Sequence, residues 1–155
     1  MPSISSLVQR LSKQDPAARR QRDEWLDDVT KLLGRIRAWV KKEEARGRVK
    51  VAETMVDITE ADLGEYQAPG LELRLPGGHL VRVEPRGARI VGVVRSGARV
   101  VGLKGRVDMS AGSKRALLLR TGRDTWRVLS SGAASETPAV LTAKTFSNAL
   151  SGLFQ

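Results

Sequence analysis

Residues 71–84, LELRLPGGHLVRVE, decide the fold. Leucines at positions 71, 73 and 75 alternate with charged residues, and a Pro-Gly-Gly turn at 76–78 leads to a second alternating run with Val81 and Val83. An apolar residue at every second position indicates a strand with one buried face. Two such runs joined by a short turn rich in glycine predict an antiparallel hairpin.

Similar runs lie on both sides of this hairpin. Strands are expected at residues 88–95, 98–104, 115–120 and 125–130, separated by turns that contain glycine. Upstream, Val49 and Val51 begin an alternating pattern, whereas residues 63–70 are typical of a loop closed by Pro69 and Gly70. Turns at this regular spacing favour an antiparallel meander of about six strands over residues 49–130.

A short repeat interrupts the pattern. GARIVGV at residues 87–93 is followed by GARVVGL at residues 97–103. The repeat fits two similar hairpin strands. It also fits a functional pair of arginines, Arg89 and Arg99, beside glycines where another backbone could approach closely. The sequence leaves both interpretations open.

Helical patterns flank the strands. Asp15 and Pro16 suit the N-cap and first turn of a long helix over residues 16–46, whose apolar positions 25, 29, 32, 36 and 39 follow helical spacing. A C-terminal helix is expected over residues 139–154. Within residues 1–15, a mobile amphipathic segment is predicted, and its apolar residues are candidates for docking to a partner: Ile4, Leu7, Val8 and Leu11.

These elements predict a single α+β domain over residues 1–155. The N-terminal helices and the C-terminal helix are expected to pack on one face of the sheet, because the apolar residues of each strand lie at every second position.

The composition excludes several classes of protein. The 155 residues include no cysteine, so disulfides, thiolate zinc sites and cysteine nucleophiles are excluded. No run of about 18 apolar residues predicts a membrane span, and residues 1–15 lack the apolar core of a signal peptide. We therefore expect a cytoplasmic protein, and the abundance of Arg, Ala and Gly suggests a bacterial source.

The chain carries a net charge of +10, with 27 Lys and Arg against 17 Asp and Glu. The excess is concentrated in residues 71–130, where a basic surface would attract nucleic acid or an acidic protein. Arginine as ordinary surface composition remains the other interpretation. The candidate contacts to an anionic partner are Arg82, Arg89, Arg99, Arg106 and Arg127.

The search for catalytic groups predicts that the protein is not an enzyme and needs no cofactor. His79 is the only histidine and follows a turn, and no nucleophile elbow or phosphate-binding loop is present. The acidic segment of Asp57, Glu60, Asp62 and Glu65, followed by Glu72-Leu73-Arg74, resembles a metal-dependent nuclease pattern only loosely. Such an enzyme is the lowest alternative.

The expected function is therefore that of a non-enzymatic accessory protein that acts through a protein partner or through self-association. A basic nucleic-acid-binding domain, which contacts the phosphate backbone through sheet arginines, is the alternative. Single-strand binders also need aromatic stacking platforms, and aromatic residues make up only 4% of this chain.

Overall fold

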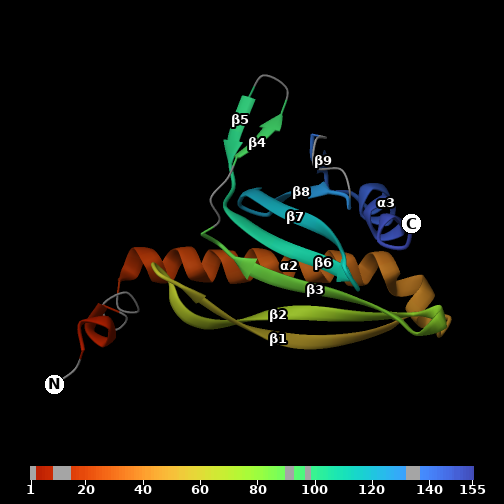
Figure 1. Cartoon of the computed structure of the whole chain (residues 1–155), viewed down its shortest axis with the longest axis horizontal. Coiled ribbons are helices and arrows are strands. Elements are labelled where there is room, and N and C mark those ends of the chain that lie inside the picture. The colour runs from red at the N-terminus through yellow and green to blue at the C-terminus, as the bar shows by residue number, and fades with distance from the viewer. Residues whose placement is uncertain (1–2, 9–14, 90–92, 97–98, 132–136) are drawn as a thin grey trace.

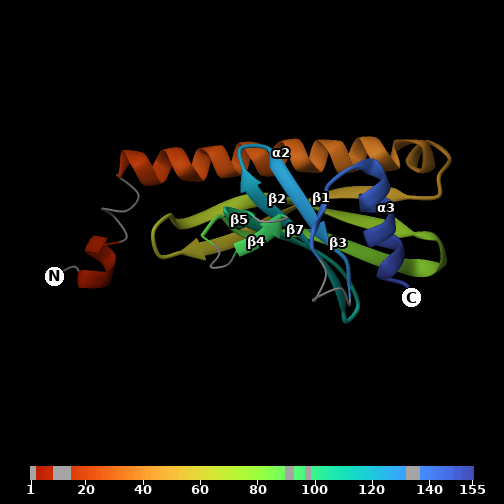
Figure 2. The ribbon, with the colours of Figure 1, turned by 90° about the horizontal axis from the view of Figure 1, so that it is seen from above.

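The fold is α+β, as the sequence predicts. The computed structural model describes residues 3–8, 15–89, 93–96, 99–131 and 137–155. Helix α2 (Pro16–Ala45) runs along a twisted antiparallel sheet, and the shorter helix α3 (Ala143–Gly152) lies near the C-terminal end of α2 (Figures 1 and 2). In the described part of the chain, no helix is both long and apolar enough to cross a membrane.

The main sheet is a meander in which every neighbouring pair of strands is antiparallel. Over the described residues it has seven strands: β1 (Lys50–Glu60), β2 (Gly64–Leu75), β3 (His79–Gly87), β6 (Gly105–Ala111), β7 (Lys114–Gly122), β8 (Thr125–Leu129) and β9 (Ala139–Val140). A short 3-10 turn, Pro76–Gly78, joins β2 to β3. The hairpin predicted over residues 71–84 is therefore confirmed.

The strands of the ten-residue repeat stand apart from this sheet. β4 (Val93–Ser96) and β5 (Arg99–Gly102) pair only with each other and project from the body as an arm between β3 and β6 (Figure 1). The expectation that both repeats contribute strands to the meander is wrong. The meander continues instead through β6, which is missing from the strands expected above.

Two further boundaries differ from the expectation. Residues 64–70, expected as a loop, belong to β2. Pro69 is tolerated there because β2 pairs with β3 only from Leu71 onward, so at Pro69 it pairs with β1 alone and a missing N–H is acceptable. At the other end, Ala139 and Val140 form β9 rather than the start of the C-terminal helix.

Helix α2 begins where the sequence predicts. The Asp15 side chain accepts a hydrogen bond from the Ala17 N–H at 3.0 Å, and Pro16 occupies the first turn. The helix continues without a break through Gly34. Its buried stripe, which packs on the sheet, consists of Ala18, Trp25, Asp28, Val29, Leu32, Leu33, Ile36 and Val40.

Helix α3 packs beside the C-terminal half of α2 on the same face of the sheet. Thr142 and Thr145 form a capping box at its N-terminus. The Phe146 ring lies 5.2 Å from the Trp39 ring of α2, measured between centroids. One core joins both helices to alternate residues of the strands, including Val81, Val83, Val107, Met109, Ala116, Leu118, Trp126 and Val128. The prediction that these helices share one face is confirmed.

The N-terminal segment lies apart from this core. Residues 4–8 form a short helical turn beyond the N-terminal end of α2 (Figures 1 and 2). Ile4, Leu7 and Val8 are all exposed. Leu11, the fourth predicted docking residue, lies outside the described residues.

Candidate functional site on the open face of the sheet

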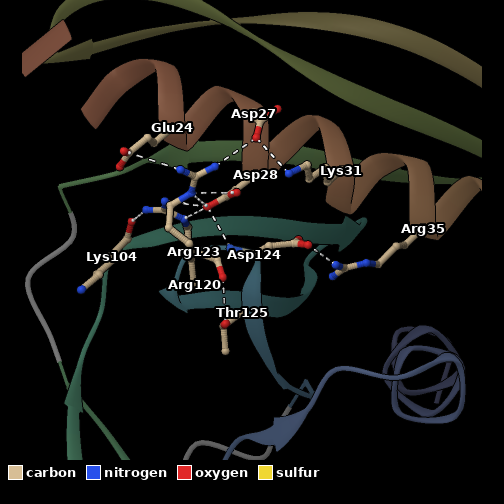
Figure 3. Close-up of polar contacts among 10 residues, drawn as sticks. All are labelled: Glu24, Asp27, Asp28, Lys31, Arg35, Lys104, Arg120, Arg123, Asp124 and Thr125. Carbon is tan, nitrogen blue, oxygen red and sulfur yellow. Dashed lines mark hydrogen bonds and ion pairs between the residues drawn. The ribbon is translucent and has the colours of Figure 1, made fainter. Parts of the chain in front are cut away.

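Among the residues whose burial the structure describes, the most deeply buried charged group belongs to α2. The side chain of Asp28 is 0% exposed and lies between the helix and the turn that joins β7 to β8 (Figure 3). It accepts hydrogen bonds from Arg120 Nε at 2.8 Å, from Arg123 Nε at 3.1 Å and from the backbone N–H of Asp124 at 3.0 Å. Asp28 therefore holds this turn against the helix.

A second set of charges surrounds this contact. Arg123 also pairs with Glu24 and Asp27 of α2, and Arg120 donates from Nη1 to the Lys104 carbonyl at 2.8 Å (Figure 3). The Arg120 guanidinium lies 5.8 Å from the centroid of the Trp25 ring, within the range of a cation–π contact. The donors of both arginines are thus directed at groups of the chain itself.

The electrostatics of Asp28 follow from these contacts. Burial alone would raise the pKa of its carboxyl group, but the Asp124 N–H, Arg120 and Arg123 together hold that pKa below its ordinary value of 3.8. Asp124 has a φ of 49°, a left-handed conformation that its backbone hydrogen bond to Asp28 helps to hold. We conclude that this group, which we call the Asp28 cluster (Asp28, Arg120, Arg123 and Asp124), ties the fold together.

The opposite face of the sheet has a different character. Side chains alternate across a strand, so the residues next to the core positions of β3, β6, β7 and β8 point away from α2. Arg82, Arg86, Arg106, Arg115 and Arg127 occupy these positions, together with Glu84 and Asp108. Arg82, Arg86 and Arg115 are exposed.

A second buried carboxylate lies at the centre of this face. Asp108 is only 1% exposed, and its oxygens meet Arg106 Nε at 2.6 Å, Arg86 Nε at 3.0 Å and Arg115 Nε at 3.5 Å. Arg106 adds a second bond from Nη2 at 3.0 Å. We call these four residues the Asp108 cluster. The Asp108 carboxylate is buried, whereas its three arginine partners remain partly exposed to solvent.

Strand register explains how the Asp108 cluster forms. Arg106 lies two residues from Asp108 on the same face of β6, and Arg115 of β7 lies opposite Ser110, the next position along that face. The pairing of β3 with β6 shifts between Pro85 and Gly87, so Arg86 falls in a bulge. Bulges commonly re-aim a side chain, and here Arg86 points at Asp108.

The cluster presents fixed cationic donors beside apolar groups. The hydrogen bonds to Asp108 raise the pKa of Arg106 above its ordinary value. Burial lowers this pKa, but more weakly. Guanidinium groups have donors in a planar fork that matches carboxylates and phosphates. Leu117 lies directly across from Asp108, and Leu129 lies beyond it in the same row. The surface can therefore bind a group that is both anionic and partly apolar.

The structure brings together only some of the predicted contacts. Arg82, Arg106 and Arg127 share this face, whereas Arg89 follows β3 and contacts Gln21 and Asp62. The other arginine of the repeat, Arg99, lies in β5, and its side chain is outside the described residues.

Sequence reasoning missed Arg86 and Asp108, and it placed Arg115 only among the arginines on or near predicted strands. A signal was available in residues 105–111, GRVDMSA, because Val107 and Met109 alternate with Arg106, Asp108 and Ser110 as on a strand with one buried face.

The acidic segment has other roles. Glu60 accepts hydrogen bonds from the Tyr66 hydroxyl and from the Arg89 N–H, and Asp57 accepts one from the Gln67 amide. Burial, with the hydrogen bond to Glu60, raises the pKa of Tyr66. Among the residues that the structure describes, no group of three or more His, Asp or Glu side chains is placed to hold a metal ion.

No protein-family model, curated protein or solved structure matches this chain.

Proposed function

We propose that this protein is a non-enzymatic binding protein that holds an acidic surface of a protein partner on its open sheet face. The observation that carries the proposal is the Asp108 cluster. A carboxylate on an uncovered sheet face is almost fully buried because Arg86, Arg106 and Arg115 converge on it. The arginines are thereby held in defined positions, and part of each guanidinium is still exposed.

This arrangement suits a protein partner in two ways. Side chains that are already ordered lose less conformational entropy on binding, so fixed arginines favour affinity. Arginine beside apolar groups is also typical of protein interfaces. On this face, Leu117 and Leu129 would supply the apolar part.

Nucleic-acid binding through the same face is the second candidate. Its support is that Arg82, Arg106 and Arg127, predicted as phosphate contacts, share this face. However, the carboxylates of Glu72, which pairs with Arg82 at 3.8 Å, and Glu84 would repel a phosphate backbone. The positions of this face in β3, β6, β7 and β8 also include no aromatic residue on which a base could stack.

The test compares charge reversal on two faces. Arg86→Glu with Arg115→Glu alters the proposed surface, and Lys41→Glu with Lys42→Glu makes the same change of charge on exposed positions of α2. Each protein is immobilised on a resin and incubated with a native extract. The retained proteins are then quantified by mass spectrometry. We expect wild type and the α2 variant to retain the same acidic protein and the Arg86/Arg115 variant to lose it.

Equal retention by the two variants would contradict the proposal. Fluorescence anisotropy with labelled single- and double-stranded oligonucleotides separates the second candidate. If wild type and the α2 variant bind an oligonucleotide with an affinity that falls steeply between about 50 and 200 mM salt, and the Arg86/Arg115 variant does not, nucleic-acid binding is favoured.

A further inference from the structure

An apolar strip runs across the strands of the open face beside the Asp108 cluster. In the strand register, Asp108 of β6 lies opposite Leu117 of β7, and Leu117 lies opposite Leu129 of β8. Both leucines are half-buried, and neither belongs to the core that α2 and α3 share with the sheet. Val140 of β9, at the edge of the sheet, is 57% exposed. We call Leu117, Leu129 and Val140 the apolar strip.

The Asp108 cluster marks one end of this strip. Its three arginines come from β3, β6 and β7, and a nitrogen of each lies within 3.5 Å of an Asp108 oxygen. The described face of β3, β6, β7 and β8 carries five arginines against the carboxylates of Asp108 and Glu84. Positive charge is therefore in excess, and a partner that follows the strip needs carboxylates where it reaches the cluster.

The strands beneath the strip decide which backbone conformation can lie on it. β6 and β7 each pair with a neighbouring strand on both sides, so their backbone N–H and C=O groups are already used. An extended segment on this face would find no backbone partner, and burial of its own polar groups would be costly. A helix satisfies these groups internally and presents one apolar stripe. Helices α2 and α3 cover the other face in this way.

The dimensions of the strip also suit a helix. Neighbouring strands lie about 4.8 Å apart, so the distance from β6 to β9 is about 14 Å. About ten helical residues cover this length at 1.5 Å per residue. Side chains one helical turn apart are separated by about 5–6 Å, which is close to the spacing of the strands. Each turn of such a helix can therefore place one apolar side chain over one strand.

We propose that the protein partner presents to this face an amphipathic α-helix of about three turns. Its apolar side chains lie on the apolar strip, and its acidic side chains lie in the terminal turn that covers the Asp108 cluster. There the exposed guanidinium groups donate charge-assisted hydrogen bonds to the acidic side chains. This inference rests on the proposed function, because it names the structure of the acidic surface that the same face holds.

Two synthetic peptides of identical length and composition test the inference. Both are held helical by the same side-chain cross-link, and circular dichroism checks their helicity. The first has its leucines in one stripe and its glutamates in one terminal turn, whereas the second has both residue types spread around the helix. By fluorescence anisotropy at physiological salt, we expect wild type to bind the first peptide at least tenfold more tightly. Equal affinities, or no binding of either peptide, would overturn the inference.

A variant of the apolar strip locates the contact. Leu117→Gln with Leu129→Gln removes apolar surface at half-buried positions and leaves the arginines in place. We expect this variant to unfold in the same temperature range as wild type and to lose the tenfold preference. Met55→Gln, at a residue of β1 that is 60% exposed, is the matched control and should keep it. A preference that survives in the leucine variant would overturn the inference. The comparison of the two peptides on wild type does not depend on this variant.

The variant with Arg86→Glu and Arg115→Glu separates this inference from the proposed function. If it binds both peptides as tightly as wild type, the arginine face does not hold acidic surfaces, and the proposed function fails together with the inference. If it loses binding while wild type holds both peptides equally well, the face holds acidic surfaces without selecting a helix. Only the present inference is then overturned.

Discussion

Two buried carboxylates, Asp28 and Asp108, gather arginines in this molecule, but their surroundings differ. Asp28 lies between a helix and a turn, and its partner Arg120 is itself only 8% exposed, whereas its second partner Arg123 is 50% exposed. Asp108 lies on an uncovered sheet face, and its partner Arg115 is 51% exposed. The Asp28–Arg120 pair is thus enclosed, whereas every arginine partner of Asp108 reaches solvent.

The two environments predict different contributions of the two clusters to the free energy of unfolding. An ion pair that is closed off from water is costly to break, because each charge left behind stays desolvated. Arginines that reach solvent can rehydrate when their carboxylate is removed, so they contribute little to folding. We therefore propose that the Asp28 cluster, through its enclosed Asp28–Arg120 pair, stabilises the fold and that the Asp108 cluster serves recognition.

The largest effect is expected from Asp28→Asn. The substitution keeps the shape of the side chain but leaves the buried Arg120 guanidinium without its counter-charge. We expect the free energy of unfolding, measured by urea denaturation, to fall by about 3–5 kcal/mol. A loss below about 1 kcal/mol would show that the enclosed pair does not stabilise the fold.

The same variant predicts a pH dependence. The folded-state pKa of Asp28 is lowered, so the stability that its charge contributes is present above its ordinary pKa of 3.8 and is lost as the pH falls through the lower folded-state value. We expect the gap in unfolding free energy between wild type and Asp28→Asn to narrow from about pH 6 to about pH 2.5. A gap that stays constant over this range would contradict the assignment.

A smaller loss of stability is expected from a substitution at Gly105 of β6. The Trp25 ring, which lies beside Arg120, packs against this position. A Cβ at Gly105 would overlap Cζ3 of Trp25, so Gly105→Ala must displace that ring, and the positive φ of Gly105 also disfavours a side chain. We expect a loss of about 1–3 kcal/mol in thermal or urea unfolding. Gly78→Ala is the matched control, because Gly78 also has a positive φ that disfavours a side chain but a Cβ there meets nothing within 4 Å. Equal effects of the two substitutions would show that Trp25 is not held by this contact.

The smallest effect on stability is expected on the open face. Arg115→Ala removes a half-exposed partner of Asp108, whose other arginines remain. The unfolding free energy should change by less than about 1 kcal/mol. Binding to the protein retained by wild type should weaken about tenfold in isothermal titration calorimetry, as expected for about 1.4 kcal/mol. Undiminished affinity would show that Arg115 does not contact the partner.

The contrast between the clusters also shows what the sequence can predict. The alternation over residues 71–84 predicts the β2–β3 hairpin because side chains of a strand with one buried face alternate in polarity. The stripe of α2 is predictable for the same reason, since burial of one face imposes helical spacing. Both patterns depend on neighbours that are close along the chain.

The two clusters could not be predicted in this way, because they join distant residues. Asp28 and Arg120 are 92 positions apart, and only the packing of α2 against the β7–β8 turn brings them together. Asp108 meets Arg86 through a bulge between β3 and β6, which the alternation along either strand does not reveal. The sequence pattern wrongly predicts that β4 and β5 belong to the main sheet, because their apolar residues resemble those of the sheet strands.

The most direct test of this assignment is the unfolding free energy of Asp108→Asn, measured by urea denaturation beside Asp28→Asn. If the arginines of the Asp108 cluster serve recognition, they rehydrate when the carboxylate is neutralised. The unfolding free energy of Asp108→Asn is then predicted to lie within about 1 kcal/mol of that of wild type. This loss is far smaller than that predicted for Asp28→Asn. A loss for Asp108→Asn as large as that for Asp28→Asn would contradict the account, because the open cluster would then be part of what holds the fold together.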